Sequence, residues 1–384
     1  MKFNYYMPTR ILFGSGSVAK LKRAGVPGKR ALLITGGTST TKLGYVDRVR
    51  EVLQEAGAES VIYDQVQPNP VLENVKACAE MIQTQGCDFV VGLGGGSAID
   101  TAKAAAVLAA NPGELWDYVF GGSGKKQKMP NKPLPVVAIT TTAGTGTEVD
   151  PWFVITNGEE KIGSGNDWTF PAIAVVDPDF MMTVPPKMTA YQGFDALFHA
   201  VEGYLARIAN PMSDLYALES IKLLGRSLVQ AVKNGQDKQA RAEVALANTL
   251  SGFVETTSSC TSEHAIEHAL SAYQPSLPHG AGLIMISLAY HKRFLQVCPE
   301  RYIQMAQALG MENASCPEDF LTALAKLQKD CGVDQLKMSE YGLQPEHFAQ
   351  YVQNARKTGG GLFSLDRQEL SDAMVMEILK ESYR

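Results

Sequence analysis

Several features are missing from this chain of 384 residues, and each absence excludes a class of protein. No uncharged apolar run reaches the roughly 18 residues that a membrane-spanning helix needs. The N-terminal stretch MKFNYYMPTRILFGSGS has neither a long apolar core nor a cleavage site, so we expect no signal peptide. Lysine and arginine are scattered and the net charge is −5, so the basic face of a nucleic-acid-binding protein is absent. We therefore expect neither nucleic acid nor a membrane among its partners.

Cysteine is also scarce. The six cysteines form no CxxC pair, and six are too few for a disulfide scaffold in a chain of this length. They are typical of free, mostly buried thiols in a reducing compartment, which predicts a cytoplasmic protein. The length itself is too great for one ordinary core and indicates two domains.

The first half of the chain alternates short apolar runs with helical patterns. Strands are expected at 30–36, at 60–66, running into glycines at 87–96, and within PVVAITTTAGTG and AIAVVDP. Helices are expected between them at 46–57, 71–86 and 97–111. Strand, helix, strand, helix predicts an α/β domain with a parallel sheet covered on both faces.

The pattern changes after VVDPDFMMTVPPKMTA. From about residue 187 the chain shows long amphipathic stretches, such as AYQGFDALFHAVEGYLAR, and almost no strand signal. Pro185 and Pro186 mark the predicted boundary. The expected domains are therefore an α/β domain over 1–185 and an all-helical domain over 186–384.

A glycine loop joins a predicted strand to a predicted helix in VVGLGGGSAIDTAK. Its three consecutive glycines, Gly94, Gly95 and Gly96, let backbone amides approach a phosphate, and the helix that starts near Ser97 directs its positive end at the anion. The spacing departs from the standard dinucleotide fingerprint, so a plain tight turn is the alternative.

A second polar loop, ITTTAGTGTEV, follows a second strand and offers several threonine hydroxyls around two glycines. By itself it could be a flexible loop with threonine-capped turns. Two such loops at the carboxyl edge of one parallel sheet favour nucleotide binding.

Four of the six histidines lie between residues 199 and 279. Asp195 and His199 are four apart on one predicted helix, so they share a face, and His264 and His268 are arranged likewise on another. His279 follows in LPHGAG, where we expect a turn. One carboxylate with several imidazoles suits Fe²⁺ or Zn²⁺.

Each of these residues also has an ordinary structural interpretation. An Asp-x-x-x-His pair is often a surface or capping contact, and a lone His268 is often a hydrogen-bonded core residue. His291 and His347 have no apparent partners and are expected at the surface. His264, Glu267 and His268 also match the His-x-x-Glu-His pattern of zinc peptidases, but that interpretation leaves both glycine loops and the Asp195 helix unexplained.

Taken together, the motifs resemble the iron-containing (group III) alcohol dehydrogenases over nearly the whole chain. The segments FGSGSV, PNP, GLGGGSAIDTAK, TTTAGTGTEV, DP, GFDALFHAVEGY and HAIEHAL with PHG occur in the family's order. The resemblance implies a Rossmann-like nucleotide domain followed by an all-helical metal-binding domain, as in the dehydroquinate synthase-like fold. It also implies a homodimer, and an enzyme that transfers a hydride between NAD(P)(H) and a small alcohol or aldehyde.

Carried over residue by residue, the resemblance implies a metal centre and a cofactor site. The implied metal ligands are Asp195, His199, His264 and His279, with His268 as a catalytic proton relay. The implied cofactor-binding residues are Gly94, Gly95, Gly96, Ser97, Asp100, Thr140, Thr141, Thr145, Asn69 and Lys161. The chain departs from the family's usual pattern just before His264, where it has Ser262 and Glu263, and Glu267 adds further acidity.

The nicotinamide cofactor can be argued from the first predicted strand. NAD-preferring sites place an acid after this strand to bind the ribose hydroxyl. Here the strand is followed by Gly37, Thr38 and Ser39, and the next acid is Asp47. This loop leaves amides, hydroxyls and Lys42 for a 2′-phosphate, so we predict NADP(H) over NAD(H).

The main alternatives share the fold: a glycerol dehydrogenase-like polyol oxidoreductase or a dehydroquinate synthase. A metallopeptidase and a non-enzymatic binding protein are the remaining candidates. Metal-dependent turnover with a nicotinamide cofactor would separate the dehydrogenases from both.

Overall fold

The computed structural model describes residues 2–384 and divides into two compact units. One unit comprises Met7–Thr142 and Thr147–Met181. The other comprises Ala143–Gly146, Met182–Arg384 and the segment that ends at Tyr6. The short segment Ala143–Gly146 therefore belongs to the second unit, although it lies within the sequence of the first. The division into two domains at residues 185 and 186 stays a prediction.

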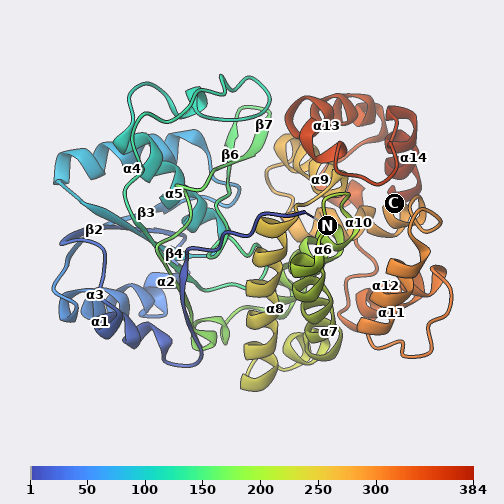
Figure 1. The fold of residues 1–384 in the computed structure, drawn as a ribbon, viewed down its shortest axis with the longest axis horizontal. Coiled ribbons are helices and arrows are strands. Elements are labelled where there is room, and N and C mark those ends of the chain that lie inside the picture. Colours follow the sequence, from blue (N-terminus) through green and yellow to red (C-terminus); the bar gives the residue numbers. More distant parts are fainter. Residues whose placement is uncertain (1) are drawn as a thin grey trace. The chain divides into compact units, whose positions relative to one another are not determined.

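The first unit is an α/β layer structure (Figure 1). Its main sheet contains the parallel strands β1 (Arg10–Phe13), β8 (Ile173–Val176), β5 (Val136–Thr140), β4 (Phe89–Gly94), β2 (Arg30–Gly36) and β3 (Glu59–Val66), in that spatial order. Its helices are α1 (Leu21–Ala24), α2 (Ser39–Lys42), α3 (Tyr45–Glu55), α4 (Leu72–Gln85) and α5 (Gly96–Ala110), with short 3₁₀ turns η1 (Ser17–Lys20), η2 (Leu115–Asp117) and η3 (Pro178–Met181).

Apolar residues on both faces of the strands explain this layering. Along β2, Leu32 and Ile34 pack with residues of α4 and α5, whereas Ala31 and Leu33 pack with residues of α3. Alternate side chains of a strand point to opposite faces, so a continuous apolar run requires cover on both. The predicted parallel sheet with helices on both faces is confirmed.

Two features of this unit were not predicted. Strand β1 has only four residues and pairs in parallel with β8 at the sheet edge. The antiparallel hairpin of β6 (Phe153–Asn157) and β7 (Glu160–Ser164) lies outside the main sheet. Its two-residue turn is Gly158 and Glu159, with Gly158 at φ 60°, and a glycine at the first turn position is a hairpin signal that could have been read from the sequence.

The second unit is helical (Figure 1). Its helices are α6 (Pro186–Leu205), α7 (Pro211–Lys233), α8 (Lys238–Thr257), α9 (Ser262–Tyr273), α10 (His279–Lys292), α11 (Pro299–Ala308), α12 (Glu318–Asp330), α13 (Phe348–Phe363) and α14 (Asp372–Ser382), with η4 (Met338–Tyr341) and η5 (Pro345–His347). Among residues 2–384, no strand follows β8, as predicted. None of the described helices combines the length and apolar character needed to cross a membrane.

Local sequence signals set where these helices begin. Proline occupies the first turn of α6 and α7, where its missing N–H costs nothing. The side chain of Asn210 caps α7, and that of Asp237 caps α8. Between them, α6, α9 and α10 carry all the predicted metal ligands.

Candidate metal centre and cofactor loops

The predicted metal ligands converge within the helical unit. Asp195 and His199 lie one turn apart on α6, His264 lies in the first turn of α9, and His279 is the first residue of α10. The expected turn at His279 is therefore wrong, because Pro278 ends the preceding loop as the helix N-cap and the glycines after it continue as helix.

The distances between ligand atoms suit a metal ion. The Oδ1 atom of Asp195 lies 3.6 Å from Nε2 of His264 and 3.4 Å from Nε2 of His279. Two donor atoms bound to one tetrahedral Zn²⁺ lie about 3.4 Å apart. The Oδ1 atom of Asp195 and the Nε2 atom of His264 are buried and have no hydrogen-bond partner. Such buried, unpartnered atoms fit a site built for a cation.

Each of the three histidines has its Nδ1 atom next to an oxygen atom, and Nε2 of His264 and of His279 faces Asp195. His199 approaches Asp195 with Nδ1, at 3.9 Å, and its Nε2 atom lies 3.9 Å from the carboxylate of Glu255. The Nδ1 atom of His199 lies 3.2 Å from the carbonyl oxygen of Gly144. Nδ1 of His264 contacts the carboxylate of Glu202, and Nδ1 of His279 contacts the carboxylate of Glu267. Where Nδ1–H donates to oxygen, a deprotonated Nε2 carries the lone pair that a metal ion binds. Burial lowers the pKa of His264, but Cys260 and Glu202 outweigh it and raise that pKa well above the ordinary value, so a metal ion must displace a proton from this imidazole.

Burial and neighbouring charges set the protonation of these ligands. Burial lowers the pKa of His199 to about 4, although Asp195 opposes the shift, so its imidazole is neutral at physiological pH. Burial raises the pKa of Asp195, but His279 and His199 outweigh it and bring that pKa far below the ordinary value. An ionised carboxylate and a neutral imidazole are the forms in which both residues bind metals.

Three supporting residues were not predicted. Glu202 lies three residues after His199 on α6, and Glu267 was assigned only in the peptidase interpretation. Position 144 leaves little room for a side chain, because a Cβ atom there would lie 3.0 Å from the backbone of Gln192 and 3.1 Å from Oδ2 of Asp195. The helical spacing of Glu202 from His199 is a signal that could have found it, whereas the Gly144 carbonyl had none.

His268 lies beside the cluster and is half-buried. Its ring centroid is 5.3 Å from that of His279 and 6.3 Å from that of His264. Together with Glu267 and His279 it forms one of three groups of ligand-type side chains found among the described residues. Its position is compatible with the predicted relay next to the metal centre.

A second Glu–His pair lies elsewhere on α9 and α10. His291 is fully buried, with Nε2 3.2 Å from the Glu263 carboxylate and Nδ1 3.2 Å from the hydroxyl of Tyr302. The expectation that His291 is a surface residue is therefore wrong, since its partners come from α9 and α11, far away in the sequence. His347 is exposed, as predicted.

The predicted phosphate loop has the expected local form. Strand β4 ends at Gly94, and α5 begins at Gly96 with Gly95 as its N-cap. Gly94 has φ 152°, and a Cβ atom on it would lie 2.9 Å from Cβ of Ala98. A Cβ atom on Gly95 would lie 2.9 Å from Oγ1 of Thr142. Glycine is thus needed where the strand turns into the helix.

The other predicted cofactor residues are distributed around this edge. Gly94 pairs with Thr140 across the sheet, and the Thr141 amide donates to the Gly94 carbonyl. The loops with Gly37, Thr38, Ser39 and Asn69 follow β2 and β3, so they share the carboxyl edge. Ser97 lies in the first turn of α5, whereas Thr145 belongs to the segment Ala143–Gly146 of the helical unit.

Asp100 and Lys161 are both buried in the α/β unit. The Asp100 carboxylate accepts hydrogen bonds from the Thr147 hydroxyl and the Val154 amide. It thereby connects α5 to the start of the β6–β7 hairpin, which carries Lys161. Any contact of these two residues with a cofactor remains a prediction.

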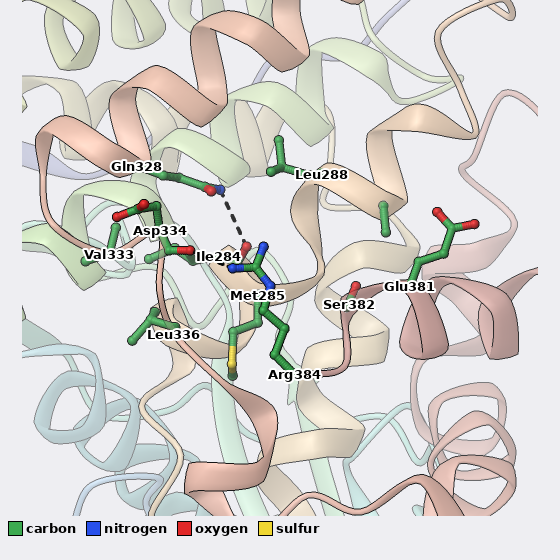
Figure 2. Close-up of a pocket in the computed structure, with 11 residues that line it drawn as sticks. Ile284, Met285, Leu288, Gln328, Val333, Asp334, Leu336, Glu381, Ser382 and Arg384 are labelled. Carbon is green, nitrogen blue, oxygen red and sulfur yellow. Dashed lines mark hydrogen bonds between the residues drawn. The ribbon is translucent and has the colours of Figure 1, made fainter.

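A pocket elsewhere in the helical unit contains none of the predicted site residues (Figure 2). It is lined by residues of α10, α12 and the C-terminal end of the chain, including Met285, Gln328 and Arg384. The Gln328 side-chain amide donates to the carbonyl of Ile284 and to the hydroxyl of Ser287. The Gln328 amide is thus paired within the fold, and the cluster of predicted metal ligands stays the candidate site.

Comparison with known proteins agrees with this geometry. Residues 8–178 match the family described as iron-containing alcohol dehydrogenase, and residues 189–383 match the C-terminal region of the Fe-containing alcohol dehydrogenase family. Alcohol dehydrogenase 4 of Saccharomyces cerevisiae is 34% identical over 99% of this chain and 98% of its own length. The 1,3-propanediol dehydrogenase of Citrobacter freundii is 32% identical over 99% of both chains.

Solved structures give the same result for the fold. An archaeal halo-thermophilic alcohol dehydrogenase from a Red Sea brine pool superposes with a TM-score of 0.94 at 33% identity. The match covers 100% of this chain and 99% of the archaeal chain. The chain therefore belongs to the iron-containing alcohol dehydrogenase family.

Proposed function

We propose that this chain transfers a hydride between NADP(H) and a small alcohol or aldehyde, using an Fe²⁺ or Zn²⁺ ion. The oxidoreductase class follows from the family. The proposed ligands are Asp195, His199, His264 and His279. The observation that carries this assignment is the pair of buried, unpartnered atoms, Oδ1 of Asp195 and Nε2 of His264, which lie 3.6 Å apart.

The bound ion would supply Lewis-acid chemistry toward the substrate oxygen. The protein's own contribution is orientation. Gly144, Glu202 and Glu267 hold the three imidazoles at Nδ1, so the centre is ordered before a substrate arrives. We assign His268 the role of moving the substrate's proton, because it adjoins His279 and imidazole is the side chain that most often transfers protons in enzymes.

The glycine loop and its neighbours are the proposed cofactor site. The amides of Gly95, Gly96 and Ser97 lie at the N-terminus of a 15-residue helix, where an anion is stabilised. Thr38 and Ser39 are exposed in the loop after β2, with Lys42 also exposed nearby. This acid-free loop supports a preference for NADP(H), since it can take a phosphate where an acid would repel it.

The direct test is oxidation of NADPH and NADH with butanal, using chelated protein reloaded with Fe²⁺ or Zn²⁺. We expect turnover only after reloading and a higher kcat/KM for NADPH than for NADH. Ser39→Asp should reverse that cofactor ratio without changing metal content. Full turnover of metal-free protein would contradict the metal assignment, and an unchanged ratio in Ser39→Asp would contradict the loop argument.

A polyol substrate is the second candidate, because one relative in the comparison is a 1,3-propanediol dehydrogenase. The assay should therefore compare butanol, 1,3-propanediol and glycerol as substrates for oxidation. The peptidase interpretation loses its basis, because the Glu267 carboxylate is bound to Nδ1 of His279.

We also propose that the chain forms a homodimer in the cytoplasm. The helical unit carries large exposed apolar side chains at Ile208 and Leu215, and on Phe3 near the N-terminus. Single exposed apolar side chains also occur on monomers, so the proposal rests mainly on the family resemblance. Sedimentation equilibrium would give the mass, and a monomer at micromolar concentration would contradict the proposal.

A further inference from the structure

A buried thiol lies next to the metal cluster. Cys260 stands in the loop between α8 and α9, two residues before the first residue of α9, and is 5% exposed. Its Sγ atom, one ring nitrogen of His199 and one of His264 all lie within 4.8 Å of one another. The thiol is thus within ligand range of two residues that already belong to the proposed metal centre.

The nitrogens that these two histidines can offer are their Nε2 atoms. Nδ1 of His199 is taken by the Gly144 carbonyl, and Nδ1 of His264 is taken by the Glu202 carboxylate. Nε2 of His264 is buried without a hydrogen-bond partner. This nitrogen and Oδ1 of Asp195, which lie 3.6 Å apart, point to a cation beside His264, the residue that the Cys260 group and the Asp195 group share.

The thiol interacts with the His264 side chain and makes one longer contact with a carboxylate, and burial raises the pKa of the thiol well above its ordinary value. Its Sγ atom lies 3.7 Å from Oε1 of Glu255, whose Oε2 atom is 3.9 Å from Nε2 of His199. A contact of this length to sulfur is weak and is readily exchanged for a metal–sulfur bond. Glu255 is also the nearest recorded base for the proton that the thiol must lose.

Resting on the proposed function, we propose that Sγ of Cys260 is an additional ligand of the ion held by Asp195, His199, His264 and His279. On metal binding the S–H bond breaks, the sulfur–metal bond forms, and the proton passes through Glu255 to solvent. No electron is transferred. The donor set then contains a soft thiolate beside one carboxylate and three imidazoles.

A thiolate ligand changes which metal the centre selects. Thiolates favour Zn²⁺, whereas carboxylate and imidazole donors alone discriminate less between Zn²⁺ and Fe²⁺. Loss of an outer contact of a ligand typically costs 10–100-fold in affinity, so loss of a direct ligand should cost roughly 10-fold or more. We expect Cys260→Ser to weaken Zn²⁺ binding by at least that factor and Fe²⁺ binding by less.

Cobalt is the sharpest probe, because Co²⁺ reports its own ligands in the absorption spectrum. Full-length protein is stripped with a chelator and loaded anaerobically with Co²⁺. We expect visible d–d bands from the centre and a near-ultraviolet thiolate-to-cobalt charge-transfer band. Cys260→Ser and Cys260→Ala should lose the charge-transfer band and keep the d–d bands, while Cys316→Ser, at an exposed thiol, should keep both.

The outcomes separate this inference from the metal centre itself. Visible bands without a charge-transfer band in the wild type, or a charge-transfer band that survives in both Cys260 variants, would overturn the role of Cys260 and leave the centre intact. Failure of the wild type to bind Co²⁺ would overturn the centre and the inference together. If the variants do not fold, the wild type still tests whether Cys260 is a ligand. The quantity to measure is its ratio of Zn²⁺ to Fe²⁺ affinity, obtained by chelator competition. A ratio no greater than that of Cys-free carboxylate–histidine sites would count against a thiolate ligand.

Discussion

Two Glu–His pairs join the same helices, α9 and α10, yet they lie in different surroundings. In the first, Glu267 holds His279, whose other nitrogen is 3.4 Å from Asp195. In the second, Glu263 lies 3.2 Å from His291, whose other nitrogen is 3.2 Å from the Tyr302 hydroxyl. The rings of Phe198 and Phe320 also pack against His291.

The difference shows that the residue types alone do not make a metal site. In both pairs a carboxylate on α9 faces an imidazole on α10. What differs is the second ring nitrogen, which faces further ligands in one pair and a closed core in the other. We expect the first pair to control metal binding and the second to control stability. Three experiments test that division, and a fourth concerns a nearby buried carboxylate.

The largest effect should come from Asp195→Ala, because this carboxylate faces both His264 and His279. Losing several kcal/mol of transition-state stabilisation lowers the rate roughly 10³-fold or more. Metal content by mass spectrometry and kcat/KM should fall together. His347→Ala, at an exposed histidine of the same unit, is the control that should change neither.

Glu263→Ala should reduce the stability of the helical unit and leave metal binding unchanged. Breaking a buried pair by removing one partner typically costs about 3–5 kcal/mol. Chemical denaturation would measure the loss of unfolding free energy, and calorimetric titration would measure the affinity of the folded protein for Zn²⁺. The double variant Glu263→Leu with His291→Phe should recover part of the stability. A large drop in metal affinity would show that the two pairs are not separate.

Glu267→Ala should weaken metal binding by roughly 10–100-fold, because the imidazole of His279 loses the acceptor that orients it. Glu267→Gln keeps an oxygen that can accept a hydrogen bond from Nδ1 of His279, so this variant should lose less metal affinity than Glu267→Ala. Chelator competition gives both affinities. Glu263→Gln is the matched control one turn away on α9, and an equal loss in this control would remove the distinction between the pairs.

The smallest expected effect is a change in how stability depends on pH, and it comes from Asp366. Its carboxylate accepts hydrogen bonds from the Tyr290 hydroxyl and from the amide of Ser262, the first residue of α9. Burial raises its pKa from 3.8 to about 7. The folded state therefore keeps this proton between about pH 4 and pH 7 while the unfolded state has lost it, so this group's contribution to stability decreases as the pH rises through that window.

Asp366→Asn should remove that contribution without removing the hydrogen-bond acceptor. The unfolding free energy of the variant, taken relative to that of the wild type, should therefore rise between about pH 4 and pH 7. Denaturation at several pH values would measure the difference. Parallel pH curves for the two proteins would contradict the assigned pKa.

Much of the fold follows directly from local patterns. The strand predicted at 30–36 has the bounds of β2, and the helices predicted at 46–57, 71–86 and 97–111 agree with α3, α4 and α5 to within one or two residues. Short elements were missed, as with the four residues of β1, because a run of only three apolar side chains is too short to indicate a strand and pairing with β8 holds it in place.

The candidate site was likewise predictable only in part from the sequence. The proposed ligands Asp195, His199 and His264 could be predicted because helical spacing or a motif connects them. The supporting contacts join residues far apart in the chain: Glu202 is 62 positions from His264, and Gly144 is 55 positions from His199. Spacing along one helix cannot reveal such contacts. The surface position expected for His291 was wrong for this reason, since its burial depends on α11 and α12.

The segment Ala143–Gly146 has a practical consequence for anyone who wishes to study the helical unit alone. The Gly146 amide donates to the Asn248 side chain, and a Cβ atom on Gly146 would lie 2.6 Å from Cα of Gly252. A fragment cut at residue 186 would contain all four proposed ligands but not the carbonyl that orients His199. Such a truncation would be a different molecule from the unit seen in the intact chain, and a faithful minimal version would need residues 143–146 grafted back onto it.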